Sequence, residues 1–396
     1  MAEPYRIIKS QLSLPHKRAD HVAVTWKNAV LIWGGQTVPY SQLDSHVYMH
    51  LSGKWTKKET TGHVPKICDG MAHVVNDKMF VFGSEILILN NSDNLQWVYS
   101  LDLNTWVWTK LAPRGTPLKG RTMGPTSWVH KERIFIFGGY EIKKYHNAIS
   151  YVWPKSKRLP CYNIASNSWE WMKQDGDIPS KRYQHSTVIS GDTLYLFGGF
   201  SNRDGYVNDL HVLDMVSMRW AKVHGNILDN NVPCNESNGK FTLVSQSMAM
   251  LYLSPSEDGV DSRSFESCWL LNLEKAKQLM DPSSIWTKIP PHFSRPAIAT
   301  TVFEPVSRSL WITGGYIQNP DGPTVMTSQV LIMPLNPSLK DLAVAAVARN
   351  HCPQDPRLAP DNLASHLRDE VAAYRVDILG ETVCSREKRC SFSPSL

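Results

Sequence analysis

Arginine and histidine recur at one spacing in this chain of 396 residues. Arg18 precedes His21 by three positions, and Arg182 precedes His185 in the same way. A guanidinium binds a carboxylate through two parallel hydrogen bonds, which is a common way to hold a peptide C-terminus or an acidic side chain. The pattern therefore indicates recognition of an anionic group. In the alternative interpretation, each arginine pairs with a carboxylate or backbone carbonyl of a neighbouring repeat and serves only the fold.

Motifs for catalysis do not accompany these residues. The sequence contains no G-x-S-x-G turn, no phosphate-binding glycine loop, no H-E-x-x-H helix and no C-x-x-C pair. Its seven cysteines are scattered and odd in number, so they indicate neither a disulfide framework nor a zinc site. We therefore predict a protein that is not an enzyme, with no catalytic residue, no metal and no cofactor.

The overall composition is that of an ordinary globular chain. Hydrophobic residues make up 42% of the sequence and charged residues 20%, which is enough apolar material for a large core. The 42 basic and 36 acidic residues leave a net charge of +6, too small over this length to indicate nucleic-acid binding. The start lacks a signal peptide, and no stretch approaches the roughly 20 apolar residues of a membrane span. We expect a cytoplasmic or nuclear protein without a membrane partner.

Apolar runs that end in paired glycines recur along the chain and must position the arginines. Four runs keep both glycines, at residues 30–35, 134–139, 194–199 and 310–315. Two further runs are degenerate, because residues 79–84 keep one glycine and residues 250–254 keep none. The six units are spaced by roughly 50 to 60 residues, which is typical of a repeat protein built from β-strands.

Most units continue with a second strand and then a tryptophan. The tryptophans in this position are Trp55, Trp108, Trp171, Trp220 and Trp286. Over residues 15–336 these features resemble the kelch repeat, and the resemblance implies an all-β, six-bladed kelch β-propeller with tryptophans between its blades. Because the sixth unit has no terminal tryptophan, we expect an N-terminal strand from residues 10–16 to complete the last blade.

The kelch resemblance also implies a place for the arginines. In kelch propellers such positions surround one mouth of the central channel, where they would form a positive rim that suits an anionic ligand. The predicted substrate-binding residues are Arg18, Arg121, Arg182, His185, Arg203, Lys240 and Arg295.

Hydrophobic periodicity changes after residue 336. Leu339, Ala343 and Val347 recur at four-residue spacing, as on one face of an amphipathic helix. Pro360 then opens a second predicted helix, which carries Leu363. Periodicity alone is equally consistent with two helices that only pack under the propeller. The expected domains are a propeller over residues 1–336, a helical extension over 337–380 and a disordered tail over 381–396.

Short motifs in the C-terminal extension point to partner proteins. Residues 338–347 look like the elongin-binding BC box, and residues 358–363 are similar to the cullin-2 box that follows it. A kelch propeller followed by these boxes resembles the family of kelch domain-containing protein 2 and its paralogues, which are substrate receptors of cullin-2 ubiquitin ligases. The resemblance implies a non-catalytic subunit that binds C-terminal or acidic degrons. It also implies contacts with elongin B/C and cullin-2 through Leu339, Ala343, Val347, Pro360 and Leu363.

The chain departs from that family where ligand specificity is decided. The family has an arginine directly after the fourth glycine pair, whereas this chain has Phe200 there and only Arg203 nearby. Residues 238–241, Asn-Gly-Lys-Phe, replace the family motif Arg-Ser-Trp-His. The resemblance therefore does not decide whether glycine ends are recognised, and the alternative ligand is another C-terminus or an internal motif. The alternative function is a kelch scaffold or trafficking adaptor with no ligase role.

Overall fold

The structure is a computed structural model in which two compact units are distinguished. One unit is residues 7–332, and the other combines residues 1–6 with residues 333–396. The fold described below is that of the first unit. The described residues are 6–8, 15–37, 42–67, 70–83, 97–115, 122–145, 148–153, 156–224, 232–233, 238–254, 268–289, 299–304, 308–317 and 325–334.

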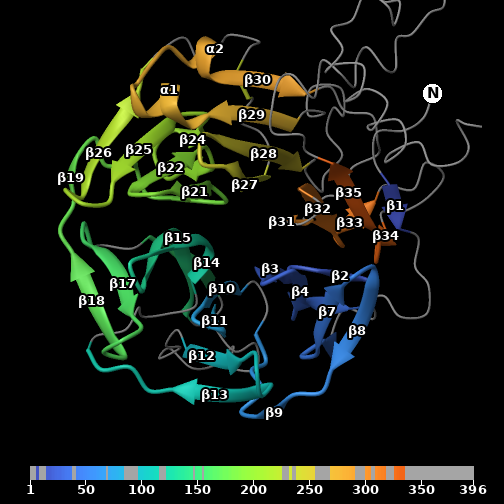
Figure 1. Ribbon diagram of the computed structural model, residues 1–396. Helices are drawn as coiled ribbons and strands as arrows, with labels where there is room; N and C mark the ends of the chain where they lie inside the picture. Colours follow the sequence, from blue (N-terminus) through green and yellow to red (C-terminus); the bar gives the residue numbers. More distant parts are fainter. Residues whose placement is uncertain are drawn as a thin grey trace, which may run out of the picture. The chain divides into compact units, whose positions relative to one another are not determined.

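Six mainly antiparallel sheets, two of them with a short parallel edge strand, make up most of the described chain, in agreement with the all-β prediction (Figure 1). The first contains β3 (Val22–Trp26), β4 (Ala29–Trp33), β7 (Val47–Leu51) and β8 (Lys54–Lys58). The second contains β10 (Met71–Val75), β11 (Lys78–Gly83), β12 (Trp97–Asp102), β13 (Val107–Leu111) and the short β9 (Thr61–Gly62). The third contains β14 (Thr122–His130), β15 (Arg133–Tyr145), β17 (Leu159–Asn163) and β18 (Ser168–Met172), with β16 (Ala148–Val152) paired to the end of β15.

The other three sheets repeat the same order. The fourth contains β21 (Ser186–Ser190), β22 (Thr193–Phe197), β25 (Leu210–Asp214), β26 (Arg219–Val223) and the short β19 (Asp175–Gly176). The fifth contains β27 (Asn238–Ser245), β28 (Met248–Ser254), β29 (Cys268–Asn272) and β30 (Trp286–Ile289). The sixth contains β31 (Thr300–Glu304), β32 (Ser309–Thr313), β35 (Val330–Pro334) and β1 (Arg6–Ile8).

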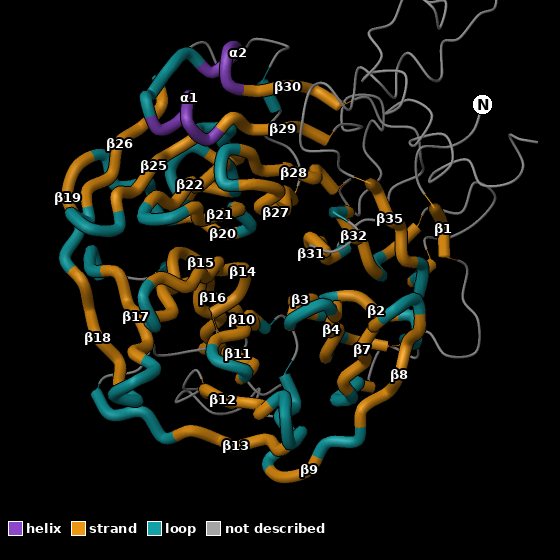
Figure 2. Tube along the Cα trace, viewed as in Figure 1, coloured by secondary structure: helices purple, strands orange, loops and turns teal. Residues whose placement is uncertain are grey.

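The six inner strands close into a ring. Each of β3, β10, β14, β21, β27 and β31 contacts the next, and β31 contacts β3 (Figure 2). Tight hairpins join the inner strands to their partners, and in two of them both turn residues have positive φ, as a two-residue type I′ turn requires. These turns are Asn76–Asp77 and Lys131–Glu132. The predicted six-bladed propeller is therefore the fold of this unit.

The structure differs from the prediction at the N-terminal strand, and it shows the form of the two degenerate repeats. An N-terminal strand does join the sixth sheet, but it is Arg6–Ile8, whereas the prediction placed it in residues 10–16. Residues 9–14 lie outside the described residues. The degenerate second and fifth units both form complete four-stranded sheets. Apolar strands that pair with their neighbours are therefore sufficient for a blade, and the second glycine is not needed.

Tryptophans on the outer strands fill the contacts between neighbouring sheets. Trp108 is 1% exposed and lies 5.3 Å from the ring of Trp33 in the first sheet. In the third sheet the buried tryptophan is Trp169, and the predicted Trp171 is only half-buried near the end of β18. Trp169 occupies the buried position, where it packs on the rings of Phe82 and Tyr162. The packing role was predicted correctly and the residue was not.

Two short helices interrupt the fifth repeat and were not predicted. Helix α1 (Leu273–Lys277) begins at Asn272, whose side chain accepts a hydrogen bond from the Lys275 backbone N–H. Helix α2 (Pro282–Ile285) begins at Asp281, with proline at its first position. Both starts are standard helix caps, so local sequence does carry this signal. No helix in the described part of the chain is long and apolar enough to cross a membrane.

Candidate functional site

The arginine–histidine pairs lie at the end of the ring where the paired glycines turn the chain. Beside the first sheet, β2 (Arg18–Ala19), β5 (Gln36–Thr37) and β6 (Gln42–Leu43) form a small sheet. Its counterpart beside the fourth sheet is β20 (Arg182–Tyr183), β23 (Phe200–Ser201) and β24 (Gly205–Tyr206). We call these two small sheets, together with His21, His185 and Lys240 next to them, the loop face.

Glycine is required where each small sheet folds back. Gly199 has a φ of +89°, and a Cβ at this position would lie 2.6 Å from the carbonyl oxygen of Tyr183. Gly35 has a φ of +85° and meets the carbonyl oxygen of Ala19 in the same way. A side chain would therefore add both backbone strain and a clash. These glycines bring the arginine strand next to the turn.

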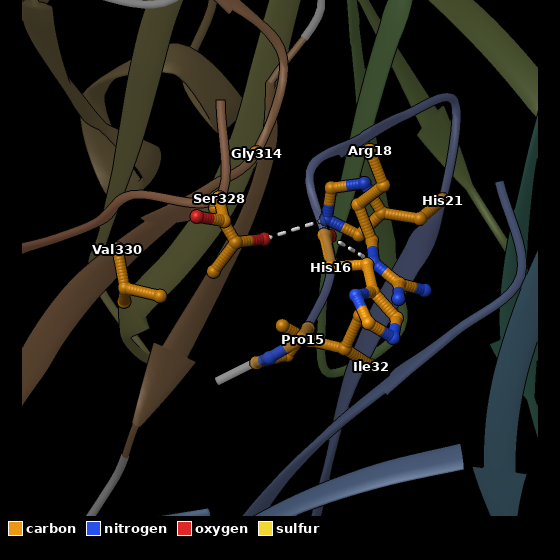
Figure 3. A pocket seen from close by; sticks show the side chains of 9 residues that line it. Pro15, His16, Arg18, His21, Ile32, Gly314, Ser328 and Val330 are labelled. Atoms are coloured by element: carbon orange, nitrogen blue, oxygen red, sulfur yellow. Dashed lines mark hydrogen bonds between the residues drawn. The ribbon is translucent and has the colours of Figure 1, made fainter. Parts of the chain in front are cut away.

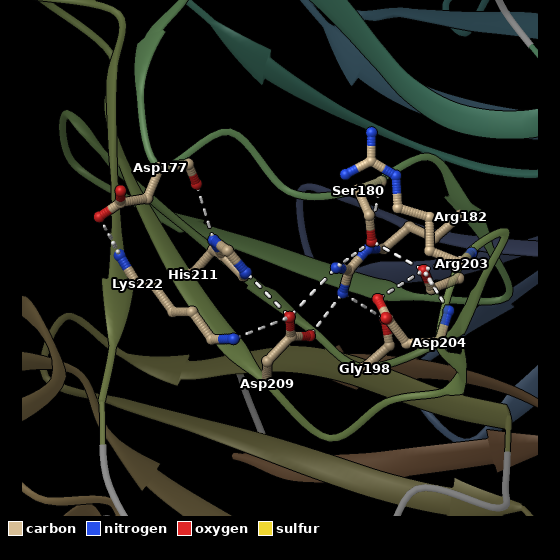
Figure 4. A network of polar contacts seen from close by, with 10 residues as sticks. Asp177, Ser180, Arg182, Gly198, Arg203, Asp204, Asp209, His211 and Lys222 are labelled. Atoms are coloured by element: carbon tan, nitrogen blue, oxygen red, sulfur yellow. Dashed lines mark hydrogen bonds and ion pairs between the residues drawn. The ribbon is translucent and has the colours of Figure 1, made fainter.

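In the fourth repeat, Arg182 is held in a dense polar network (Figure 4). The side chain is 1% exposed, and its Nη1 and Nη2 donate to the two carboxylate oxygens of Asp209 at 2.6 and 3.1 Å. Nη1 also donates to the carbonyl oxygen of Gly198 at 3.0 Å, and Nε donates to that of Ser180 at 3.1 Å. The guanidinium is thus saturated by oxygens of the same repeat.

Asp209 is the centre of this network. Its Oδ2 lies 2.9 Å from Nε2 of His211 and 3.9 Å from Nζ of Lys222. Burial alone would raise the pKa of Asp209, but the hydrogen bonds from His211 and Arg182 and the charge of Arg182 outweigh it and hold that pKa well below its usual value. Asp209 is therefore a carboxylate throughout the physiological range.

The first repeat builds the same arrangement from different neighbours. Arg18 is 1% exposed, and its Nη2 lies 2.5 Å from Oδ2 of Asp44 while Nη1 donates to the carbonyl oxygen of Gly34 at 2.9 Å. Asp44 also accepts from the Tyr48 hydroxyl at 3.0 Å, and the Arg18 guanidinium lies 4.7 Å from the centre of the Tyr48 ring. Arg18 and Arg182 are therefore structural equivalents.

Arg18 and Arg182, which were predicted to bind substrate directly, are both held by partners within the protein. A substrate carboxylate would have to displace an internal carboxylate and a backbone carbonyl from a buried guanidinium, so its hydrogen bonds would only replace strong ones that are already made. The alternative considered from the sequence, pairing within the protein, agrees with both positions, but each partner lies in the same repeat and not in a neighbouring one. The two arginines anchor the glycine turns of the loop face.

The histidines of the two pairs are buried and neutral. His185 is 3% exposed, and its Nε2 lies 2.8 Å from the Thr126 hydroxyl; Nε2 of His21 lies 2.7 Å from the Thr313 hydroxyl. Burial, and then the positive charge of the neighbouring arginine, lowers the pKa of each ring to about 3. His185, which was predicted among the substrate-binding residues, therefore adds no positive charge to the loop face, because its ring is neutral.

Of the other predicted cations, two are described and both are exposed. Arg203 lies in the turn between β23 and β24, and Lys240 lies near the start of the inner strand β27. The charge of Lys240 lowers the pKa of both His21 and His185, so its ammonium is within electrostatic range of repeats one and four. Within the described chain, neither cation has a carboxylate at ion-pair distance. Arg121 and Arg295 lie outside the described residues.

A small hollow lies between the sixth and first repeats (Figure 3). Its polar lining comes from His16, Arg18, His21, Thr313 and Ser328. Arg18 is already paired, and Nδ1 of His21 is buried without a hydrogen-bond partner in the described structure. The hollow therefore leaves one unpartnered ring nitrogen beside an arginine that is already paired, which suits a small polar molecule such as water.

Sequence reasoning missed a group of aromatic residues on the loop face. Tyr183 pairs with Phe200 and Phe200 with Tyr206 across β20, β23 and β24, and the ring centres are 5.3 and 5.1 Å apart. Tyr140 and Trp153 of the third repeat lie 4.8 and 5.9 Å from Tyr183. A simple signal was present, because the residue after each complete glycine pair is Gln36, Tyr140, Phe200 or Tyr316.

The family of the chain follows from comparison with known proteins. Residues 20–159 and 153–332 match the family model described as the KLHDC2/KLHL20/DRC7 Kelch-repeats domain. The chain belongs to this kelch-repeat family. The matched residues span the six sheets, in agreement with the resemblance found in the glycine and tryptophan pattern.

Individual relatives are distant. Kelch domain-containing protein 2 of Bos taurus is 23% identical over 371 residues, which cover 85% of this chain and 86% of that protein. Kelch domain-containing protein 1 of Homo sapiens is 24% identical over 246 residues, covering 52% of this chain and 55% of that protein. Acyl-CoA-binding domain-containing protein 4 of Arabidopsis thaliana is 26% identical over 182 residues, covering 43% and 25%. This chain thus spans about a quarter of the length of that plant relative.

The kelch-repeat family indicates a general role. Kelch-repeat proteins of this kind act in protein binding. In the residues that the structure describes, no group of three or more histidine, cysteine or acidic side chains could hold a metal ion. The described cysteines, Cys161 and Cys268, are buried thiols.

Proposed function

We propose that this kelch-repeat protein is a non-catalytic receptor that binds peptide segments of other proteins at the loop face. The observation that carries the proposal is the contrast in charge there. Arg18 and Arg182 are neutralised by Asp44 and Asp209, whereas Arg203 and Lys240 are exposed cations without a carboxylate partner in the described chain. An acidic side chain or C-terminus of a bound peptide supplies that partner.

The proposal extends to a ubiquitin ligase. Residues 338–347 and 358–363 resemble the BC box and the cullin-2 box, and the similarity to kelch domain-containing protein 2 extends over 85% of this chain. In this proposal the chain is the substrate-recognition subunit of a ligase with elongin B/C and cullin-2, and it acts in the cytoplasm or nucleus. The propeller binds the degron, and the partners carry out the chemistry.

Co-purification of the full chain with elongin B/C and cullin-2 tests the ligase role. On the predicted helix, Leu339 provides an apolar anchor, and complete burial of a leucine contributes about 1.5 to 3 kcal/mol. Leu339→Ala should therefore weaken elongin C binding by about tenfold or more, and the propeller should stay folded. The matched control, Pro360→Ala with Leu363→Ala, should spare elongin C and weaken cullin-2 binding.

Two results would contradict the ligase role. One is a wild-type chain that never co-purifies with elongin C, and the other is unfolding of the whole chain by Leu339→Ala. Either would make the C-terminal segment a structural element and leave a kelch scaffold or adaptor as the function. Peptide binding itself is tested by a separate double variant, Arg203→Ala with Lys240→Ala. This variant should bind a peptide more weakly, and its binding should depend less on salt concentration.

A further inference from the structure

The small sheet of the fourth repeat has an unusual distribution of polar and apolar side chains. Residues directly opposite each other in neighbouring strands face the same side of a sheet. Arg182 pairs with Ser201 on one side, and both are 1% exposed. Tyr183, Phe200 and Tyr206 form the row on the other side, where two are half-buried and Tyr206 is 43% exposed. The charged row is thus buried and the aromatic row faces outward.

The aromatic row continues into the third repeat. The long hairpin of β15 and β16 brings Tyr140 and Trp153 beside it, with their ring centres 6.3 Å apart. Both side chains are half-buried, so five aromatic rings form one partly exposed surface. Contiguous exposed apolar surface of this kind marks an interaction site more often than isolated apolar residues do.

Positive charge borders this aromatic surface. Lys181 directly precedes strand β20, which is Arg182–Tyr183, and Arg203 lies in the turn that joins Phe200 to Tyr206. Both are exposed, and neither has an ion-pair partner in the described chain. Asp204, in the same turn, accepts a hydrogen bond from Ser201. The border therefore carries an excess of positive charge and favours a partner with carboxylates.

We propose that this aromatic surface, formed by Tyr140, Trp153, Tyr183, Phe200 and Tyr206, seats a bulky apolar side chain of an acidic peptide segment. This inference rests on the proposed peptide recognition at the loop face and specifies its substrate class. Aromatic rings supply a large contact area at low conformational cost, so they serve as anchors for an apolar side chain. The neighbouring cations then bind carboxylates on either side of the anchor.

The first repeat shows why the fourth is the anchor site. The positions equivalent to Tyr183 and Phe200 hold Ala19, which is fully buried, and Gln36, which is half-buried. A small sheet of the same architecture therefore folds without an aromatic row. The rings of the fourth repeat are not needed to build the sheet, and their exposure needs another explanation.

A displayed library of random ten-residue peptides, selected on the purified full chain, tests the proposal. Selected peptides should share a bulky apolar residue within a few positions of aspartate or glutamate. Phe200→Gln introduces the residue that the first repeat carries, and Tyr206→Gln changes the most exposed ring. Each should raise the Kd of a selected peptide by about tenfold or more, since an apolar side chain loses its burial. Val216→Gln, at a 67% exposed apolar residue in the turn after β25, should leave the Kd unchanged.

The outcomes separate this inference from the function on which it rests. Thermal unfolding of both variants must match that of the wild type, and Tyr206→Gln keeps the test valid if Phe200→Gln fails to fold. Selected peptides that lack an apolar anchor, or a Kd that both variants leave within twofold, would overturn the aromatic anchor while peptide recognition stands. A library that yields no binding peptide would overturn both.

Discussion

Repeats one and four share a buried arrangement and differ in the surface that covers it. In each, an arginine that is 1% exposed pairs with an aspartate and donates to the carbonyl oxygen of the first glycine of the pair. On the opposite side of the small sheet, repeat one has Ala19 and Gln36, and repeat four has Tyr183 and Phe200. The shared side stabilises the fold, and the variable side is where the two repeats present different surfaces.

The largest expected effect comes from breaking the shared side. Asp209→Ala leaves the buried Arg182 without its carboxylate, and removal of one partner from a buried ion pair costs about 3 to 5 kcal/mol. Asp44→Ala should cost a similar amount, because Arg18 is equally buried. Urea unfolding monitored by tryptophan fluorescence measures both changes in the free energy of unfolding.

A double variant sharpens that result. Arg182→Met with Asp209→Leu removes both charges and should destabilise the protein less than Asp209→Ala alone, because no guanidinium remains unpaired. If Asp209→Ala costs under about 1 kcal/mol, then Arg182 is not an internal anchor. The prediction that it binds substrate directly would then return.

A smaller effect is expected at the glycines. Gly199→Ala should cost more than Gly205→Ala, although both residues have positive φ, because a Cβ meets backbone at Gly199 and nothing within 4 Å at Gly205. The strain of a left-handed residue alone is about 1 to 2 kcal/mol, which is the expected loss for Gly205→Ala. Gly35→Ala should match Gly199→Ala in thermal unfolding, and unequal losses would contradict the equivalence of the two repeats.

Stability should also fall in mild acid, equally for both repeats. His21 and His185 have a pKa of about 3 when folded, against 6.5 for the ordinary side chain. The unfolded chain therefore binds more protons between these values, so stability is complete above pH 6.5 and declines as the pH falls toward 3. Each ring contributes about 1.4 kcal/mol per pH unit.

Single substitutions locate this pH dependence. The free energy of unfolding is measured against pH between about 6 and 4.5, which is above the usual carboxyl pKa of about 4. His21→Gln and His185→Gln should each reduce the slope of this curve by the same amount. A slope that neither substitution changes would assign the acid sensitivity to other groups.

The sequence predicted the architecture well because the repeat is encoded by local and periodic features. Glycine pairs, apolar runs and tryptophans recur at fixed intervals, and the structure places them in six sheets as expected. Errors arose where neighbours in space decided the outcome. Trp169, and not the predicted Trp171, fills the contact between sheets because Phe82 and Tyr162 pack against it. No local sequence pattern shows which of the two tryptophans is buried.

The candidate site was harder to predict for the same reason. Arg18 and Arg182 have the right type for carboxylate binding, but their partners Asp44 and Asp209 lie 26 and 27 positions away in the sequence. The sequence alone could not decide between an internal partner and a ligand. The aromatic row was missed because Tyr183 and Phe200 become neighbours only after the small sheet forms.

The smallest effect on stability is expected from exchanging the variable side. Phe200→Gln removes a half-buried ring from the aromatic row but leaves Arg182, Asp209 and the glycine turn intact, so the free energy of unfolding should fall by less than about 1 kcal/mol. The reciprocal Gln36→Phe in repeat one should also change it by less than about 1 kcal/mol, because that position is only half-buried. Urea unfolding of the two variants measures both values. A loss of several kcal/mol on Phe200→Gln would mean that the aromatic row is part of the core, and the division into a structural and a variable side would then fail.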